Sequence, residues 1–400
     1  MARLGFAFAE WSDAAPVLVG RDTRGSGPAL EAALARGLTA GGSAVTLGGV
    51  LPTPAVGLLT EGCGAVVSAS HNPPEYNGVK LFARDGRKLS DAEEAEIEEL
   101  LPGEAPADET RPARDDSLRE RYVELVTERF GVPLDGLRLA VDCANGAMSG
   151  LGPAAFERLG ARVTTIGDAP DGTNINVGCG ATDLTALATA TREAEHDLGV
   201  AFDGDGDRML AVDPGGNPID GDATLAVLAL HLRVELVAVT EMSSLGFHRL
   251  MAGHGIRTVT TPVGDRYLLE ALREHDGILG GEQSGHVVCL DGHTTGDGLA
   301  AALLLARAVA ESGEPLADLA AQLEPVPQAK RNVLVRTKTF TPALHVELGR
   351  LNAELDGRGR ILVRPSGTEP VVRVLAEAET QETADRLSDT IAALVGRELG

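Results

Sequence analysis

Short apolar runs alternate with amphipathic segments along most of the chain. The compact apolar runs, typical of buried strands, are residues 16–20, 44–47, 64–67, 137–142 and 198–202. Segments with helical spacing of apolar positions are residues 2–12, 27–41, 52–61 and 151–159. This alternation predicts parallel sheets covered by helices, with ligand-binding groups at the carboxyl ends of the strands. Because the rhythm begins again near residues 236 and 331, it predicts repeated, similar α/β domains.

Length, charge and cysteine usage narrow the class of protein. A chain of 400 residues exceeds what one hydrophobic core supports, so we expect roughly two to four domains. The formal net charge of −24 disfavours nucleic acid and anionic membranes as main partners, and a phosphate-bearing substrate would need a locally positive pocket. No apolar run reaches membrane-spanning length, and Glu10 and Asp13 interrupt the place of a signal peptide's apolar core. The four cysteines are widely separated, which predicts reduced, mostly buried thiols in a cytoplasmic protein.

The first candidate site is the turn that follows the apolar run 64–67. Asn72 tolerates left-handed backbone and Pro73 fixes φ, so we expect the turn to present Ser70 to solvent beside His71. For an isolated Ser-His pair, an ordinary polar turn at the end of a strand is the commoner explanation. The dipeptide at 77–78 is Asn-Gly, a hairpin signal, so residues 79–82 should form a strand that brings Lys80 back toward Ser70.

Two arginines follow the first predicted strand, in the stretch Arg21-Asp22-Thr23-Arg24. Their place at the carboxyl end of a strand suits a ligand-binding role, and Arg21 is a candidate substrate ligand. A surface ion-pair cluster explains the same residues equally well.

Three aspartates follow the buried run 198–202 at alternate positions, separated by glycines: Asp203, Asp205 and Asp207. Their mutual repulsion calls for a cation, and hard oxygen ligands indicate Mg²⁺. A calcium loop of the EF-hand kind is excluded, because Arg208 stands where that loop needs glycine and Pro214 where it needs glutamate. A plain acidic surface turn is the remaining alternative, and the buried strand before the cluster favours the metal site.

Two further turns carry groups suited to a phosphosugar. In the turn 280–286, Glu282 can accept hydrogen bonds from two neighbouring hydroxyls and Ser284 can donate or accept one. The turn 365–370 lies between two apolar strands and is flanked by Arg364 and Arg373. Its two hydroxyls and its glycine suit an anion-binding nest, to which the arginines add charge.

No P-loop and no strand–G-x-G-x-x-G–helix pattern occurs, which excludes P-loop nucleotide hydrolases and a dinucleotide fold. A presented serine, a divalent cation, hydroxyl-binding groups and a phosphate cradle together predict phosphoryl transfer between a serine and a phosphosugar.

Four motifs resemble the signatures of the α-D-phosphohexomutase superfamily. They are Ser68-Ala-Ser70-His-Asn-Pro73, Asp203-Gly-Asp-Gly-Asp207-Arg208, Gly281-Glu-Gln-Ser-Gly-His286 and Arg364-Pro-Ser-Gly-Thr-Glu-Pro370. Within the superfamily the chain is most similar to the phosphoglucosamine mutase branch. The stretches that carry this closer similarity are Asn174–Ala181, Val263–Tyr267, Gln283 and Thr294–Gly298.

The resemblance implies an α/β architecture of four domains around a central cleft, three similar α/β domains and a C-terminal α+β domain. The expected domains are 1–131 with the phosphoserine, 132–233 with the metal, 234–328 with sugar recognition and 329–400 with phosphate binding. Relatives usually open with a strand bearing Phe-Gly-Thr-x-Gly-x-Arg-Gly, whereas residues 1–6 correspond to the middle of the helix after it. The first domain is therefore expected to lack that strand, through a late start-codon assignment or in a divergent, impaired paralogue.

The resemblance also implies a phosphosugar mutase that moves phosphate between O6 and O1, through a phosphoserine at Ser70 and a bisphosphosugar intermediate. Hexose 1,6-bisphosphate would prime the serine, and one Mg²⁺ would be held by the Ser70 phosphate with Asp203, Asp205 and Asp207. His71 and Lys80 would be general acid/base candidates, with Arg208 beside them. The implied substrate ligands, besides Arg21, are Glu282, Ser284, His286, Arg364, Ser366, Gly367, Thr368 and Arg373.

The expected reaction interconverts glucosamine 6-phosphate and glucosamine 1-phosphate, in a monomer or homodimer. One alternative keeps the reaction but acts on glucose, mannose or another phosphosugar. A second alternative is a phosphosugar-binding paralogue without turnover. The presence of Ser70, Lys80 and the three aspartates favours turnover, because binding alone does not need them.

Overall fold

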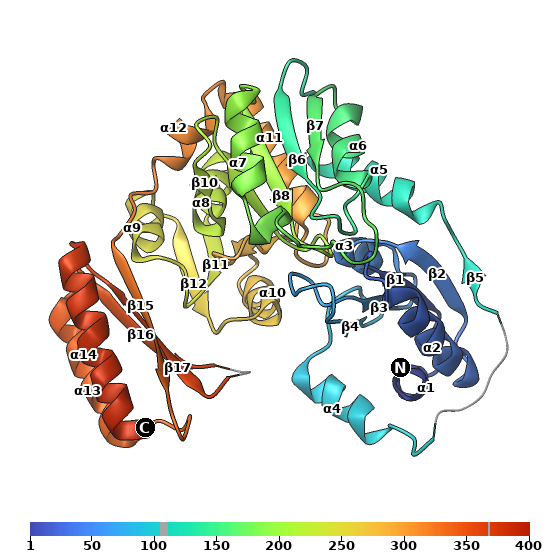
Figure 1. Cartoon of the computed structure of the whole chain (residues 1–400), viewed down its shortest axis with the longest axis horizontal. Coiled ribbons are helices and arrows are strands. Elements are labelled where there is room, and N and C mark those ends of the chain that lie inside the picture. The colour runs from blue at the N-terminus through green and yellow to red at the C-terminus, as the bar shows by residue number, and fades with distance from the viewer. Residues whose placement is uncertain (105–110, 367–368) are drawn as a thin grey trace. The chain divides into compact units, whose positions relative to one another are not determined.

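The computed structural model describes residues 1–104, 111–366 and 369–400. These residues form two compact units, one of residues 1–242 with 255–322 and the other of residues 243–254 with 323–400. The first unit contains three mixed sheets and the second contains one antiparallel sheet (Figure 1). The expected alternation of strands and helices is confirmed.

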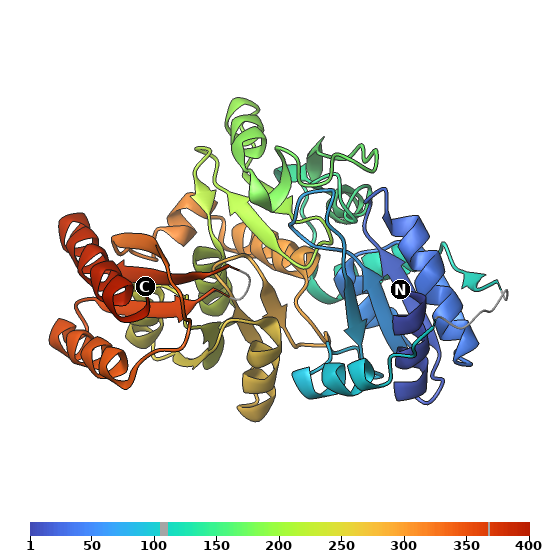
Figure 2. The ribbon, with the colours of Figure 1, turned by 60° about the horizontal axis from the view of Figure 1, so that its bottom comes forward.

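The first sheet has the strand order β4-β3-β1-β2-β5. Strand β1 pairs in parallel with β2 and β3, whereas β4 returns antiparallel to β3, as the Asn-Gly signal predicted. Helix α1 lies along α2 (Figures 1 and 2). The strands are β1 (Val17–Arg21), β2 (Val45–Val50), β3 (Cys63–Val67), β4 (Val79–Phe82) and β5 (Ala113–Arg114). The helices are α1 (Ala2–Trp11), α2 (Gly27–Ala40), α3 (Thr53–Leu59) and α4 (Asp91–Glu99).

The second sheet repeats this plan in the order β10-β9-β8-β6-β7, with β8 parallel to β6 and β9 antiparallel to β8. Its strands are β6 (Arg138–Asp142), β7 (Arg162–Ile166), β8 (Leu198–Phe202), β9 (Met209–Val212) and β10 (Pro218–Ile219). The helices of this segment are α5 (Leu118–Phe130), α6 (Leu151–Arg158), α7 (Thr185–Glu193) and the 3₁₀ turn η1 (Gly180–Thr182).

The third sheet has the order β12-β11-β13-β14 and again ends in an antiparallel edge strand, β14. Its strands are β11 (Leu236–Thr240), β12 (Arg257–Thr261), β13 (Leu279–Gly281) and β14 (Val287–Cys289). Its helices are α8 (Gly221–Leu232), α10 (Asp265–Glu274), α11 (Gly298–Ser312) and α12 (Leu316–Ala320). The loops β3–β4, β8–β9 and β13–β14 therefore occupy the same topological position in three similar sheets.

The second unit is an antiparallel sheet of order β15-β17-β16 packed against helices. Its elements are α9 (Leu245–Gly253), β15 (Gln328–Leu334), α13 (Pro342–Leu355), β16 (Arg360–Pro365), β17 (Val371–Glu377) and α14 (Gln381–Leu399). Buried Leu344, Val372, Ile391 and Val395 form much of its core. Glu377 is fully buried and accepts hydrogen bonds from Leu245 N, so α9 is tied to this sheet at its first residue.

Burial follows the apolar pattern of the sequence. Strands β3 and β8 are buried at every position because both faces of their sheets are covered, and both are continuous apolar runs. The four cysteines carry free, buried thiols, as expected. Among the described helices, none combines the length and the apolar character that a bilayer-spanning segment needs.

Candidate active site

Ser70 lies in the β3–β4 loop with a left-handed backbone, at a φ of 50°. This conformation costs an L-residue roughly 1–2 kcal/mol, so the surrounding contacts must maintain it. The Ser70 amide donates to Ser68 Oγ at 2.9 Å, and Ser70 Oγ donates to Asp203 Oδ2 at 2.5 Å. His71 Nδ1 lies 3.4 Å from the same Ser70 Oγ.

The serine is buried, with 8% of its surface exposed, so the prediction that the turn presents it to solvent is wrong. The β8–β9 loop covers it. A Cβ placed on Gly204 would lie only 2.6 Å from the Ser70 carbonyl oxygen, so the glycine between the aspartates allows this close approach. Local turn chemistry associated left-handed backbone with Asn72, whereas the structure has it at Ser70. It also could not anticipate a cover from the second sheet.

Three carboxylates converge in that β8–β9 loop. Asp203, Asp205 and Asp207 are buried, and one carboxylate oxygen of each lies within 4.8 Å of the others. The Oδ1 atoms of Asp205 and Asp207 have no hydrogen-bond partner among the described residues. Burial and the charges of Asp207 and Asp205 raise the pKa of Asp203. Buried, unpartnered carboxylate oxygens in so close an array fit a hard divalent cation.

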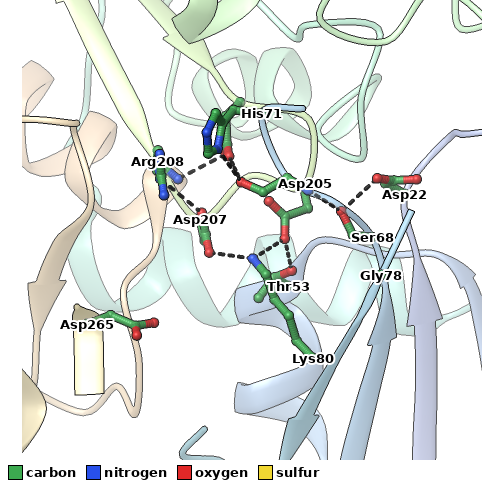
Figure 3. Close-up of polar contacts among 12 residues, drawn as sticks. Asp22, Thr53, Ser68, His71, Gly78, Lys80, Asp205, Asp207, Arg208 and Asp265 are labelled. Carbon is green, nitrogen blue, oxygen red and sulfur yellow. Dashed lines mark hydrogen bonds and ion pairs between the residues drawn. The ribbon is translucent and has the colours of Figure 1, made fainter. Parts of the chain in front are cut away.

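Lys80 reaches this cluster from β4, as the hairpin prediction expected. Its Nζ donates to Asp205 Oδ2 at 2.5 Å and to Asp207 Oδ2 at 2.7 Å (Figure 3). Burial acts to lower the pKa of Lys80, but the charges of Asp205, Asp207 and Asp203 outweigh it and raise the pKa. His71 is exposed overall, but partial desolvation of its ring and then the charge of Arg208 lower its pKa. The cluster therefore combines a persistent ammonium with an imidazole that favours its neutral form.

Neighbouring elements fix the backbone of the aspartate loop. The first residue of α3, Thr53, donates its amide to the Asp205 carbonyl at 2.9 Å and its hydroxyl to the Asp205 carboxylate. Gly298, the first residue of α11, donates its amide to the Gly206 carbonyl at 3.1 Å. Segments from the first and third sheets thus hold the loop of the second.

A second polar cluster adjoins Asp207. Lys88 lies 3.5 Å from Asp207 Oδ2 and donates a hydrogen bond to Asp265, the first residue of α10. His286 is buried, with Nδ1 3.9 Å from Asp207 Oδ1 and Nε2 3.8 Å from Asp265 Oδ2. Burial acts to raise the pKa of Asp265, but Lys88 and His286 lower it to about 2. This pairing connects the segment after β4 to the third sheet.

Glu282 and Ser284 lie in the β13–β14 loop. Ser284 Oγ donates to Glu282 Oε2 at 2.9 Å, and Gly264 N donates to Glu282 Oε1 at 3.2 Å. Met209 N donates to the Gly285 carbonyl at 3.0 Å, which joins this loop to the strand that follows Arg208. Gly285 has a φ of 89°, and a Cβ there would meet the Met209 carbonyl at 2.3 Å, so only glycine fits.

Arg208 lies beside the aspartates (Figure 3). Its backbone amide donates to Asp203 Oδ1 at 3.1 Å, and its Nε lies 3.8 Å from Asp207 Oδ1. Burial acts to lower the pKa of Arg208, but the charges of Asp207, Asp203 and Glu282 raise it.

The two arginines after β1 have different surroundings. Arg21 lies 3.4 Å from Glu31 and donates to the Asp22 carbonyl at 3.1 Å. Arg24 is fully buried, pairs with Asp22 at 2.8 Å and donates to carbonyl oxygens of the serine loop. Arg24 is therefore not part of a surface ion-pair cluster, which was the alternative explanation from the sequence.

In the second unit, the β16–β17 turn carries the predicted phosphate cradle. Arg364 and Arg373 are direct partners across the antiparallel pair. Like charges directly opposite one another destabilise a sheet, and the exposed Glu369 offsets part of this repulsion through its hydrogen bond of 3.1 Å from Arg373 Nη2. The positive charge that remains on this pair suits an anion. Lys338 Nζ donates to the Ser366 carbonyl at 2.7 Å and adds a third cation. Gly367 and Thr368 lie outside the described residues.

Comparison with known proteins identifies the family of this chain. The phosphoglucomutase/phosphomannomutase models match in chain order: α/β/α domain I at residues 1–107, domain II at 120–216, domain III at 220–326 and the C-terminal domain at 304–394. The phosphoglucosamine mutase of Staphylococcus haemolyticus is 45% identical, over 98% of this chain and 91% of that protein. The chain belongs to the phosphoglucomutase/phosphomannomutase family.

Other members of the family agree in sequence and architecture. The phosphoglucosamine mutase of Bacillus subtilis is 43% identical, over 96% of this chain and 90% of that protein. A crystal structure is known of a phosphoglucomutase/phosphomannomutase family protein from Burkholderia thailandensis whose sequence is 26% identical. It superimposes with a TM-score of 0.83 and covers 99% of this chain and 93% of the other. The predicted fold class, three α/β domains and a C-terminal α+β domain, is confirmed.

In the first unit, the structure brings together most of the residues that the sequence motifs indicated. Ser70, His71, Lys80, Asp203, Asp205, Asp207 and Arg208 form one cluster, to which His286 contributes. Arg21 pairs with Glu31 instead. The roles assigned to all these residues stay predictions.

Other residues at the site escaped sequence reasoning. Thr53, Lys88 and Asp265 have no local signal, because folding alone brings Thr53 and Lys88 to the aspartates and Asp265 to Lys88. Asn176 lies in a stretch that marked the family resemblance, yet nothing in that stretch indicated contact with the serine loop. Lys338 lies between β15 and α13 and has no motif of its own.

Proposed function

We propose that this protein is a Mg²⁺-dependent phosphosugar mutase that interconverts glucosamine 6-phosphate and glucosamine 1-phosphate. Its similarity to phosphoglucosamine mutases runs through nearly the whole chain. The observation that carries the mechanism is the hydrogen bond of 2.5 Å between Ser70 Oγ and Asp203 Oδ2, within a buried cluster of three aspartates. A serine nucleophile beside a site for a divalent cation is the arrangement that phosphoryl transfer needs.

Ser70 is proposed to carry the exchangeable phosphate. In the first half-reaction a sugar hydroxyl forms a bond to phosphorus as the phosphorus–Oγ bond of phosphoserine breaks; the hydroxyl proton passes to a base, and Ser70 Oγ takes up a proton as it leaves. The product is a bisphosphosugar. In the second half-reaction Ser70 Oγ gives up its proton and bonds to the other phosphorus, the bond between that phosphorus and the sugar oxygen breaks, and the departing sugar oxygen receives a proton. The net result moves phosphate between O6 and O1 and restores phosphoserine.

His71 and Lys80 are the proposed proton-transfer and charge-stabilising groups. His71 Nδ1 lies 3.4 Å from Ser70 Oγ, and its lowered pKa suits a proton acceptor at neutral pH. Lys80 keeps its proton beside Asp205 and Asp207, so it suits stabilisation of negative charge on the transferring group. Arg208 adds a second fixed cation at the same cluster.

Asp203, Asp205 and Asp207, with the phosphate on Ser70, are the proposed ligands of one Mg²⁺. The Oδ1 atoms of Asp205 and Asp207 accept no hydrogen bond from the described residues, which supports this assignment, because buried carboxylate oxygens need a donor or a bound cation. Bound there, Mg²⁺ would supply positive charge to the oxygens of the transferring phosphoryl group.

The remaining proposed ligands bind the sugar and the non-reacting phosphate. Glu282, Ser284 and His286 would contact the sugar and Arg21 would serve as a further substrate ligand, while Arg364, Ser366, Gly367, Thr368 and Arg373 would hold the phosphate. We further propose the domain limits 1–131, 132–233, 234–328 and 329–400, hexose 1,6-bisphosphate as primer, and a monomer or homodimer.

Turnover of glucosamine 6-phosphate by the 400-residue chain tests this proposal. The assay contains Mg²⁺ and a trace of hexose 1,6-bisphosphate, with Ser70→Ala as control and glucose and mannose phosphates in parallel. We expect glucosamine 1-phosphate to appear with wild-type protein only. Faster turnover of glucose or mannose phosphate would overturn the substrate assignment, and no turnover of any sugar would favour a binding protein.

A further inference from the structure

The carbonyl oxygens of Ser70 and Asn72 are held by the same two side chains. Arg24 Nη2 donates to the Ser70 oxygen at 2.9 Å and to the Asn72 oxygen at 2.8 Å. Asn176 Nδ2 donates to the same two oxygens at 2.9 Å and 3.1 Å. Because each nitrogen reaches both oxygens, the two carbonyls converge on a common point. Their partial negative charges repel, so this loop conformation depends on donors placed between them.

Arg24 also holds the amide side of Ser70. Its Nε donates to Asp22 Oδ2 at 2.8 Å, and the same oxygen accepts from Ser68 Oγ at 2.6 Å. Ser68 Oγ in turn accepts the Ser70 amide at 2.9 Å. The guanidinium donates further to Tyr76 O at 2.9 Å and to Pro73 O. The peptide groups on both sides of Ser70 are thus fixed by one buried network.

Asn176 approaches from the segment of the second sheet. Its own backbone is left-handed, at a φ of 59°, and its amide donates to the Ala144 carbonyl at 2.9 Å. This orientation directs the carboxamide toward the serine loop of the first sheet. Asn176 is only partly buried, so its side chain can be changed without removing core packing.

We propose that Arg24 and Asn176 are positioning residues that hold Ser70 in its left-handed conformation and so direct Oγ toward the aspartate cluster. This inference rests on the proposed phosphoryl transfer to and from Ser70. Rotation of the Ser70 backbone would swing Oγ away from Asp203, and a displacement of about 1 Å costs on the order of 100-fold in rate. Neither residue is assigned a role in proton transfer or substrate contact.

The test compares Asn176→Ala, Asn176→Asp and Arg24→Lys with wild type. Asn217→Ala is the matched control, since the side-chain hydrogen bonds of this asparagine in the same segment go to Asp213 of its own turn. We expect Asn176→Ala to lower kcat about tenfold and Arg24→Lys about 100-fold, with KM for the phosphosugar unchanged. Asn176→Asp should lower kcat more than Asn176→Ala does, because a carboxylate would face two carbonyl oxygens and repel them. If Asn176 merely filled space, the nearly isosteric Asn176→Asp would be the milder change.

Two further readouts separate failure of this inference from failure of the proposed function. The rate at which hexose 1,6-bisphosphate phosphorylates Ser70 reports positioning even if another sugar is the substrate. Crystal structures of wild type and Asn176→Asp report the Ser70 φ angle without any activity. A positive φ in wild type that changes in the variant supports the inference. Wild-type kcat in both Asn176 variants, with unchanged Ser70 geometry in Asn176→Asp, would overturn it, while an inactive wild type would count against the mutase alone.

Discussion

Ser70 Oγ and Asp203 Oδ2 lie 2.5 Å apart although 133 residues separate them in the sequence. Each residue follows a buried strand that pairs in parallel on one side and with the next, antiparallel strand on the other. The β13–β14 loop, with Glu282, has the same position in the third sheet. Repetition of one sheet plan therefore gives the proposed nucleophile, the proposed cation site and the proposed sugar-contact loop equivalent places in three similar segments.

Replacing Lys80 should separate catalysis from metal binding. Lys80→Met removes the ammonium that pairs with Asp205 and Asp207, so we expect kcat to fall about 100-fold. Affinity for Mg²⁺ should increase in the same variant, because the carboxylates lose a competing cation. Calorimetric Mg²⁺ titration and turnover measure the two effects, and exposed Lys330→Met serves as control. Weaker Mg²⁺ binding in Lys80→Met would contradict this view.

The ion pair between Lys88 and Asp265 should stabilise the fold in a pH-dependent way. The pKa of Asp265 is about 2 in the fold, below its ordinary value of 3.8, so its contribution is complete above pH 3.8 and lost as pH falls through about 2. Asp265→Asn should therefore cost about 2 kcal/mol near pH 6, and the difference from wild type should narrow below pH 4. Urea unfolding of both proteins across this pH range measures the difference in stability. The exposed pair Arg129–Asp291 provides Asp291→Asn as control, for which we expect less than about 1 kcal/mol.

The buried Tyr122 hydroxyl should contribute to stability through Asp297. It donates to both carboxylate oxygens, at 2.8 Å and 2.9 Å, and Asp297 also caps α11 by accepting from Leu299 N. Tyr122→Phe leaves this buried carboxylate with fewer donors and should cost about 1–3 kcal/mol in urea unfolding. Tyr76→Phe is the control, since Tyr76 is 58% exposed. Equal unfolding midpoints for the two variants would show that this hydrogen bond contributes nothing.

Replacing Arg364 should weaken substrate binding and strengthen the sheet. Arg364→Gln removes one of two like charges directly opposed across β16 and β17, so we expect stability to rise by about 0.2–1 kcal/mol. KM for the phosphosugar should rise about tenfold with kcat nearly unchanged, because the proposed phosphate contact would bind substrate and transition state alike. Arg331→Gln, which breaks ion pairs with Asp385 and Asp389, is the control with unchanged KM. A lower KM in Arg364→Gln would contradict the phosphate assignment.

The strands and helices could be predicted from sequence because their apolar periodicity is strong. The hairpin that carries Lys80 was predicted for a local reason, the Asn-Gly turn, and the aspartate cluster because it follows a buried strand. The burial of Ser70 was not predicted, since the covering loop comes from another sheet. Residue type and spacing predict what a segment can form, but not which distant segment will cover it.

Arg24 shows the same limit for arginines. In the polar stretch that contains both arginines, nothing in the sequence distinguishes Arg24 from Arg21. In the fold, however, Arg21 is half-buried beside Glu31, whereas Arg24 is fully buried and donates to backbone carbonyls. Only the folded serine loop creates those acceptors. Lys88 and Asp265 meet for a similar reason, across 177 residues.

Transfer of phosphate through Ser70 tests the central claim most directly. The protein is incubated with Mg²⁺ and hexose 1,6-bisphosphate carrying labelled phosphate, then freed of the sugar and mixed with glucosamine 6-phosphate. We predict one labelled phosphate on Ser70, none in Ser70→Ala, and passage of the label to glucosamine 1,6-bisphosphate. Label that never binds Ser70, or that remains on it in the presence of every phosphosugar tested, would contradict the account.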